Sequence, residues 1–178
     1  MGRLEGKVAI VTGGAMGIGH ATSLLMAREG ARVVVADLQL DAARTTAAQI
    51  LAAGGQATAM HLDAMSESSI EALVRQTHEV YGALHVLHNN VGGTDSARDT
   101  TVVEMDWAYW NTALTLNLSS TVYACRCAIP LSIEGSHRLV CVEVVHHPAV
   151  VLDPPRGCCS RASRCREFPR PCRERWRA

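Results

Sequence analysis

The stretch that decides the fold runs from Val8 to Gly19 and reads VAIVTGGAMGIG. The residues up to Thr12 are apolar and mostly β-branched, which is typical of a buried parallel strand. A glycine-rich turn and then an apolar pattern at helical spacing follow. Gly13 tolerates backbone angles that a Cβ would disfavour, and Gly17 and Gly19 allow close approach of a ligand or a strand. Because the start of a helix attracts anions, this strand–turn–helix indicates a site for the phosphates of a dinucleotide.

A second apolar run, residues 31–36, ends at Asp37. A carboxylate at this place accepts hydrogen bonds from the adenosine ribose and repels the 2′-phosphate of NADP. The glycine turn contains no basic residue. We therefore expect NAD as the cofactor in preference to NADP. Capping of a helix that starts near Asp41 would also explain Asp37, but not its occurrence together with the glycine turn.

Strand and helix patterns alternate along the chain, which predicts an α/β fold with a doubly wound parallel sheet, Rossmann-like and three-layered (αβα). Cofactors in such sheets bind at the carboxyl ends of the strands. Gly13, Asp37, Asp63 and Asn90 all fall at such ends. The predicted strands are 7–12, 31–36, 56–61, 84–88 and 138–145, and the predicted helices are 17–29, 41–53, 67–81 and 103–128.

The glycine turn has the spacing Thr-Gly-x3-Gly-x-Gly rather than the general G-x-G-x-x-G. Asp37 and Asp63 follow the second and third predicted strands, the segment 89–92 reads NNVG, and Asn117 lies in the sequence LNL. Together and in this order, these motifs resemble the short-chain dehydrogenase/reductase family over about residues 4–135. The resemblance implies a Rossmann fold that binds a nicotinamide dinucleotide.

The resemblance also assigns roles to single residues. Asp63 would contact the adenine, and Asn117 would kink its helix and hold a water of the proton relay. Val91 and Met16 depart mildly from the family pattern, which has Ala and a small or polar residue there. The residues expected to bind the cofactor are Thr12, Gly13, Met16, Gly17, Ile18, Gly19, Asp37, Leu38, Asp63, Ala64, Asn90, Val91 and Gly92.

The other catalytic residues of the family are missing. Its members use a Ser together with Tyr-x3-Lys, in which the lysine lowers the pKa of the tyrosine so that it can act as a base. Lys7 is the only lysine, and Glu143 and Val144 stand where the serine is expected after the fifth strand. Asn117 is therefore the only member of the catalytic set that remains. None of the tyrosines is followed by a lysine four residues later; they are Tyr81, Tyr109 and Tyr123.

These features predict an incomplete oxidoreductase. The complete enzyme would transfer hydride between NAD and an alcohol or ketone, and this chain would be inactive. An alternative is a non-catalytic NAD-binding or subunit-interaction module. The resemblance also implies a homo-oligomer, a dimer or a tetramer, and Trp107 and Trp110 on the long predicted helix could serve this assembly or a local core.

The predicted domain is an incomplete Rossmann domain over residues 1–137, followed by 138–178 with a fifth strand and a tail unlike the family. Proline and arginine are frequent in the tail, so we expect it to be disordered. It could result from out-of-frame reading of a GC-rich coding region, with a break near 132–137, or it could be a genuine divergent C-terminus. We expect no metal site, because the tail lacks paired C-x2-C spacing. The candidate ligands there would be Cys158, Cys159, Cys165, Cys172, His146 and His147.

The composition bounds the possible partners. The 178 residues carry a formal net charge of zero, and 48% are hydrophobic. This balance predicts one globular domain without a nucleic-acid or membrane partner. No stretch is apolar and long enough to span a bilayer, and a strand starts too early for a signal peptide. We therefore expect a cytoplasmic protein.

Overall fold

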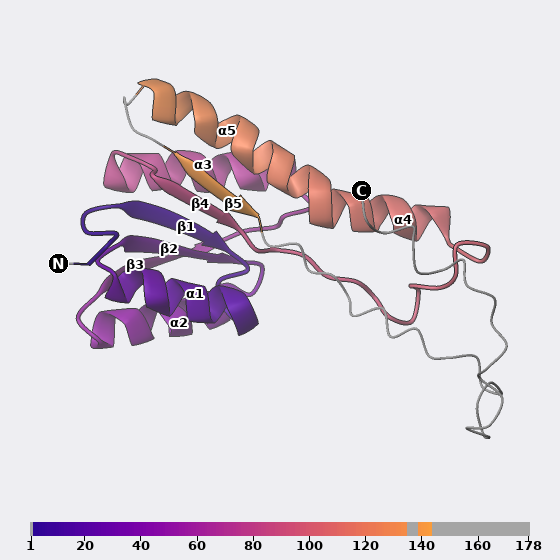
Figure 1. The fold of residues 1–178 in the computed structure, drawn as a ribbon, viewed down its shortest axis with the longest axis horizontal. Coiled ribbons are helices and arrows are strands. Elements are labelled where there is room, and N and C mark those ends of the chain that lie inside the picture. The colour runs from indigo at the N-terminus through magenta and orange to yellow at the C-terminus, as the bar shows by residue number, and fades with distance from the viewer. Residues whose placement is uncertain (1, 135–138, 144–178) are drawn as a thin grey trace, which may run out of the picture. The chain divides into compact units, whose positions relative to one another are not determined.

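The structure is a computed structural model that describes residues 2–134 and 139–143. The described strands form a five-stranded sheet in the order β3-β2-β1-β4-β5, and every neighbouring pair is parallel (Figure 1). The strands are β1 Val8–Thr12, β2 Arg32–Asp37, β3 Gln56–His61, β4 Val86–Asn89 and β5 Val140–Glu143. The helices are α1 Gly17–Arg28, α2 Leu40–Ala52, α3 Glu67–Tyr81, α4 Trp107–Leu114, the π-helical η1 Thr115–Ser119 and α5 Ser120–Glu134.

Helices cover both faces of the sheet, as expected for three αβα layers. In Figure 1, α1 and α2 lie on one side of the strands, and α3 and α5 lie on the other. Side chains alternate between the two faces along a strand. In β1, Ile10 therefore belongs to the core cluster that contains Leu73 of α3 and Ala128 of α5, whereas Val11 belongs to the cluster that contains Ile50 of α2. Because β1 is buried on both faces, its sequence is continuously apolar.

The order of the strands creates a switch point beside β1. After β1, the chain builds β2 and β3 on one side of it and then returns to place β4 on the other side. Ligands of open α/β sheets bind at such a point, outside the carboxyl ends of the strands. Here it lies between Gly13, which follows β1, and Asn90, which follows β4.

The long helix departs from its predicted range of 103–128. Its regular part begins at Trp107, because the Asp106 carboxylate accepts a hydrogen bond from Ala108 N at 2.9 Å and so caps the helix. It continues through η1 and α5 past Pro130 to Glu134. Packing of α5 on α3 and β4 outweighs the hydrogen bond that proline cannot donate.

No helix in the described part of the chain is long and apolar enough to cross a membrane. The tail from residue 144 onward, with the candidate metal ligands predicted there, lies outside the described residues. Residues 138, 144 and 145 of the predicted fifth strand also lie outside them.

Candidate functional site

A cleft of about 510 Å³ opens at the switch point. It brings together the glycine turn after β1 and the segments that follow β2, β3 and β4. All predicted cofactor residues except Thr12 and Gly19 line it. The lining residues are Gly13, Met16, Gly17, Ile18, Asp37, Leu38, Leu62, Asp63, Ala64, Met65, Asn90, Val91, Gly92 and Leu116.

Gly13 and Gly19 give the turn its tight shape. Gly13 has a φ of 63°, in the left-handed region that glycine adopts without strain. A Cβ on Gly19 would collide with the Gly13 carbonyl oxygen and come within 2.6 Å of Asn90 Nδ2. The start of α1 can therefore fold back onto the end of β1 only with glycine at position 19. Gly19 shapes the cleft from behind rather than lining it.

Thr12 and Asn90 join the carboxyl ends of β1 and β4. Thr12 Oγ1 accepts hydrogen bonds from Asn90 N at 2.9 Å and Val91 N at 3.1 Å. Asn90 Nδ2 in turn donates to the carbonyl oxygens of Thr12 at 3.1 Å and Gly13 at 3.2 Å. Thr12 is buried, so its contribution to the cleft is to fix the two strand ends relative to each other.

Asp37 presents a carboxylate that is already oriented by the main chain. Its Oδ2 accepts a hydrogen bond from Ala15 N at 3.1 Å, and its Oδ1 accepts one from Gln39 N at 3.0 Å. It does not cap α2, whose N-cap residue is Gln39. The alternative role considered from the sequence, helix capping, is therefore not what positions this side chain.

Asp63 stands at the far side of the cleft, after β3. Its Oδ1 accepts a hydrogen bond from Met65 N at 2.9 Å, and its own N–H donates to Ser69 Oγ at 3.0 Å. Ser69 belongs to the first turn of α3, which Ser66 caps by accepting from Ser69 N. The start of α3 thus holds Asp63 and Ala64 at the wall of the cleft.

The N-terminus of α1 faces the cleft without a side-chain cap. Its N-cap residue, Met16, makes no capping hydrogen bond, unlike Ser66 on α3 and Asp106 on α4. The first N–H groups of a helix have no partners within the helix, and the helix dipole adds positive potential there. Met16, Gly17 and Ile18 line the cleft at this point. The arrangement is suited to an anionic group.

Asn117 lies in η1, where the helix widens by one residue. Its amide pairs with the backbone of Gly93, because Oδ1 accepts from Gly93 N and Nδ2 donates to Gly93 O, both at 2.9 Å. Nδ2 also donates to the Ala113 carbonyl at 2.9 Å. The side chain therefore ties the helix to the segment after β4. Asn117 does not line the cleft, but its neighbour Leu116 does.

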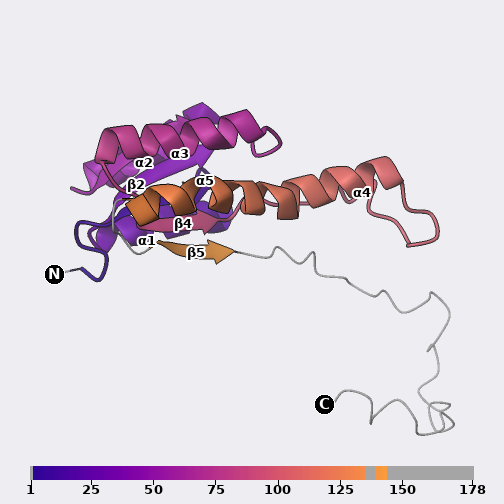
Figure 2. The same cartoon turned by 90° about the horizontal axis from the view of Figure 1, so that it is seen from above.

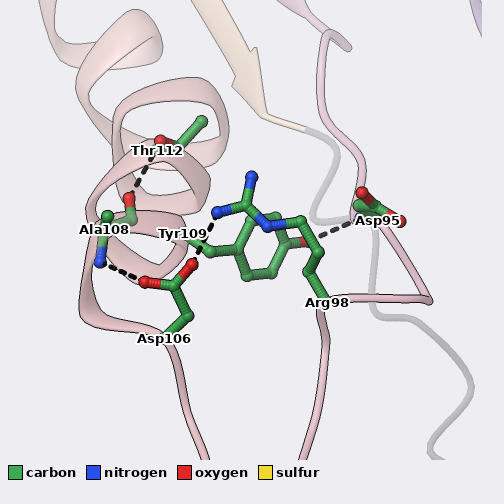
Figure 3. Close-up of polar contacts among 6 residues, drawn as sticks. All are labelled: Asp95, Arg98, Asp106, Ala108, Tyr109 and Thr112. Carbon is green, nitrogen blue, oxygen red and sulfur yellow. Dashed lines mark hydrogen bonds and ion pairs between the residues drawn. The ribbon is translucent and has the colours of Figure 1, made fainter.

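The segment between β4 and α4 is anchored to the first turn of α4 (Figure 3). The Tyr109 hydroxyl accepts a hydrogen bond from Asp95 N at 2.5 Å, and the Arg98 guanidinium stacks on the Tyr109 ring at 4.8 Å. Arg98 also bonds Asp106 at 2.6 Å, and this bond is the main reason why the pKa of the Asp106 carboxyl is lowered.

No described tyrosine or lysine lies at the cleft. The Tyr81 hydroxyl pairs with Thr58 at 2.7 Å, and the Glu67 carboxylate raises the pKa of the Tyr123 phenol. Lys7 immediately precedes β1, so it lies at the amino ends of the strands, whereas the cleft lies at their carboxyl ends. On β5, Glu143 pairs with Asn89 of β4, so the backbone at the end of β5 reaches the cleft edge of the sheet.

Sequence reasoning missed three lining residues, Leu62, Met65 and Leu116. Each lies next to a predicted site residue in the sequence. The motifs therefore identified the segments that form the cleft, but not every residue of those segments that lines it. Within residues 2–134 and 139–143, no group of three or more His, Cys, Asp or Glu side chains is arranged to hold a metal.

Comparisons with known proteins agree with this geometry. The family profile described as short chain dehydrogenase matches residues 7–145. Among curated proteins, the 7alpha-hydroxysteroid dehydrogenase of Bacteroides fragilis is 38% identical over 146 residues, which cover 82% of this chain and 56% of that protein. The chain spans about half the length of the curated relatives it matches.

Solved structures match the same part of the chain. A hydroxysteroid dehydrogenase from Escherichia coli superposes with a TM-score of 0.69 at 34% identity and covers 74% of this chain and 55% of that one. A metagenomic short-chain oxidoreductase, solved in complex with NADP, gives a TM-score of 0.71 at 30% identity and covers 76% of this chain and 60% of that one.

Proposed function

This chain belongs to the short-chain dehydrogenase family, and we propose that its cleft binds NAD. The observation that carries the proposal is the cleft itself, which joins the glycine turn, the uncapped start of α1, Asp37 and Asp63. The pyrophosphate would lie at the start of α1, where N–H groups and the helix dipole favour anions. Asp37 would accept hydrogen bonds from the adenosine ribose, and Asp63 would contact the adenine.

Charge supports NAD over NADP. Asp37 and Asp63 line the cleft, and none of its lining residues is Lys, Arg or His. A 2′-phosphate beside Asp37 would meet like charge without a compensating cation. At contact distance such repulsion costs about 1–4 kcal/mol, depending on the local dielectric. We therefore expect NAD to bind at least about tenfold more tightly than NADP.

Calorimetric titration of the 178-residue chain with NAD⁺ and with NADP⁺ tests this proposal. In Asp37→Asn the charge is removed but the shape is kept, so the preference for NAD⁺ should shrink to a few-fold. Asp41→Asn is the control, because Asp41 is exposed on α2 and pairs with Arg44 outside the cleft. If NAD⁺ fails to bind the folded wild-type chain, or if both variants change the preference equally, the proposal is wrong.

For the complete protein we propose hydride transfer between NAD and an alcohol or ketone. The nicotinamide supplies or accepts the hydride when bound. The residues of this chain would hold the dinucleotide, and Asn117 would fix Gly93 and the segment beside the cleft. The absence of Tyr-x3-Lys from the sequence supports the prediction that this chain does not catalyse the reaction. Formation of NADH from a secondary alcohol, lost in Asp37→Arg, would contradict it.

A second candidate function is a non-catalytic module that binds NAD or pairs with other subunits. The exposed apolar side chains of α4 and α5 favour it, since a single chain leaves them in water. We propose that the chain forms a homo-oligomer through these helices. In either function, we propose that residues 1–137 form an incomplete Rossmann domain. Binding of NAD without turnover would support this module, whereas turnover would exclude it.

A further inference from the structure

A buried hydroxyl reaches the glycine turn from a neighbouring helix. Thr46 lies within α2 and is 2% exposed, and its Oγ1 donates a hydrogen bond to the Ala15 carbonyl at 3.3 Å. A threonine in a helix commonly donates to the carbonyl one turn earlier. Thr45 does so, with Oγ1 bonded to the Asp41 carbonyl at 3.0 Å. The Thr46 hydroxyl is instead directed to the Ala15 carbonyl, in the turn after β1.

His20 completes this contact from the first turn of α1. Its Nδ1 lies 3.0 Å from Thr46 Oγ1. A carbonyl can only accept, so when the Thr46 proton points to Ala15, the hydroxyl oxygen accepts from His20 Nδ1. This arrangement requires the His20 tautomer that carries its hydrogen on Nδ1. The result is a chain of two hydrogen bonds that runs from His20 through Thr46 to Ala15.

Both main-chain groups of Ala15 are thereby fixed. Its N–H donates to Asp37 Oδ2 at 3.1 Å, and its carbonyl accepts from Thr46. The described backbone contains no cis peptide bond, so the Met16 N–H points opposite to the Ala15 carbonyl. Because that carbonyl is drawn toward α2, the Met16 N–H is turned away from α2. Met16 lines the cleft at the start of α1.

We infer that Thr46 and His20 are positioning residues for the pyrophosphate of the dinucleotide, because they set the orientation of the Ala15–Met16 peptide. Neither side chain lines the cleft, so they act through Ala15. The inference rests on the proposed function, since it names residues that shape the same site. It also links Thr46 to Asp37, the acid proposed to bind the ribose, through a single residue, Ala15, whose carbonyl and N–H they bind.

Titration of the full chain with NAD⁺ and with adenosine, followed by NMR, tests the inference. Thr46→Val keeps the shape and helix propensity of threonine but loses the hydroxyl. We expect it to weaken NAD⁺ binding about five- to tenfold, the effect of one buried hydrogen bond. Adenosine has no pyrophosphate, so its affinity should stay within about twofold. Thr46→Ser keeps the hydroxyl and should restore NAD⁺ binding.

Thr45→Val is the matched control, because it makes the same change one residue away on the exposed side of α2. His20→Leu should weaken NAD⁺ binding in the same direction, and His20→Asn, which retains a donor near the Nδ1 position, should restore it. If Thr46→Val does not fold, as judged by circular dichroism, the comparison of His20→Leu with His20→Asn tests the inference.

Three results would overturn the inference: wild-type NAD⁺ affinity in folded Thr46→Val and His20→Leu, equal losses for NAD⁺ and adenosine, or an equal loss in Thr45→Val. Failure of the wild-type chain to bind NAD⁺ is a different outcome. It would remove the proposed function itself, and the inference with it.

Discussion

His88 brings a polar ring into the interior of the sheet. It lies on β4 and is 5% exposed, and neither ring nitrogen has a hydrogen-bond partner among the described residues. Burial disfavours the charged imidazolium, so the pKa of His88 is lowered from its ordinary value of 6.5. The ring is therefore neutral in the folded protein at neutral pH.

Acidification should destabilise the fold through His88. The unfolded chain takes up this proton near pH 6.5, whereas the folded chain takes it up only at lower pH. The free energy of unfolding should therefore fall as the pH falls below about 6.5, and this contribution is retained above that pH. Urea unfolding between about pH 7.5 and 5.5 should show a shallower pH dependence for His88→Leu than for the wild-type chain. His61→Leu, at an exposed position on β3, is the control, and identical slopes for wild type and His88→Leu would refute the assignment.

Asn117 gives a second prediction at the scale of one residue. In Asn117→Asp, an oxygen replaces Nδ2 and faces the carbonyl oxygens of Gly93 and Ala113, to which Nδ2 donates. We expect a loss of about 2 kcal/mol in the free energy of unfolding at neutral pH. Asn111→Asp makes the same change at an exposed position on α4 and should cost much less. Equal costs in chemical denaturation would show that the pairing with Gly93 contributes little.

At the scale of elements, α4 holds the segment that borders the cleft. Tyr109→Phe keeps the ring beneath Arg98 but removes the hydroxyl that accepts from Asp95 N. We expect a loss of about 1 kcal/mol and faster amide exchange near Asp95, measured by hydrogen–deuterium exchange. Tyr123→Phe is the control, because Tyr123 lies on α5 beside Glu67 of α3, away from this segment. Unchanged exchange in Tyr109→Phe would mean that Arg98 alone anchors the segment.

The same scale shows which elements a sequence can reveal. The glycine turn and the first four strands were predicted to within two residues, because their patterns depend on residues that are adjacent in the chain. Only Val140–Glu143 of the predicted fifth strand lies in a described strand. The end of the long helix was predicted wrongly, since packing of α5 overrides the local signal of Pro130. The contact of Thr46 with Ala15 spans 31 residues, and the sequence around Thr46 does not distinguish it from Thr45. Motifs therefore mark the groups that face a cofactor better than the groups that support them.

At the scale of the whole molecule, the long helix leaves apolar side chains in water. It runs on as α4 beyond the strands (Figure 2), and Trp107 and Trp110 are 68% and 43% exposed. Of the two roles expected for these tryptophans, the exposure excludes packing in a local core. Leu114, Leu118, Val122 and Ile129 continue the exposed apolar surface at helical spacing. Exposed apolar surface of this kind marks an interface or a liability to aggregate.

Self-association should therefore depend on this helix. We expect the wild-type chain to sediment as a dimer or larger species and Val122→Glu to shift it toward the monomer, because a buried carboxylate opposes the interface. Val80→Glu is the matched control, since Val80 is equally exposed but lies on α3. A monomeric wild-type chain in sedimentation equilibrium, or an equal effect of both variants, would contradict the proposed assembly.

The cleft has a further consequence for how the protein is made. Every residue that lines it lies between Gly13 and Leu116. Protein domains fold in order of emergence during synthesis. All the residues that the cleft offers to a dinucleotide are therefore synthesised before α5 and β5. A nascent chain that has emerged from the ribosome beyond Leu116 displays every cleft residue before β5 is in place, so it is the earliest form in which the nucleotide could take part in folding.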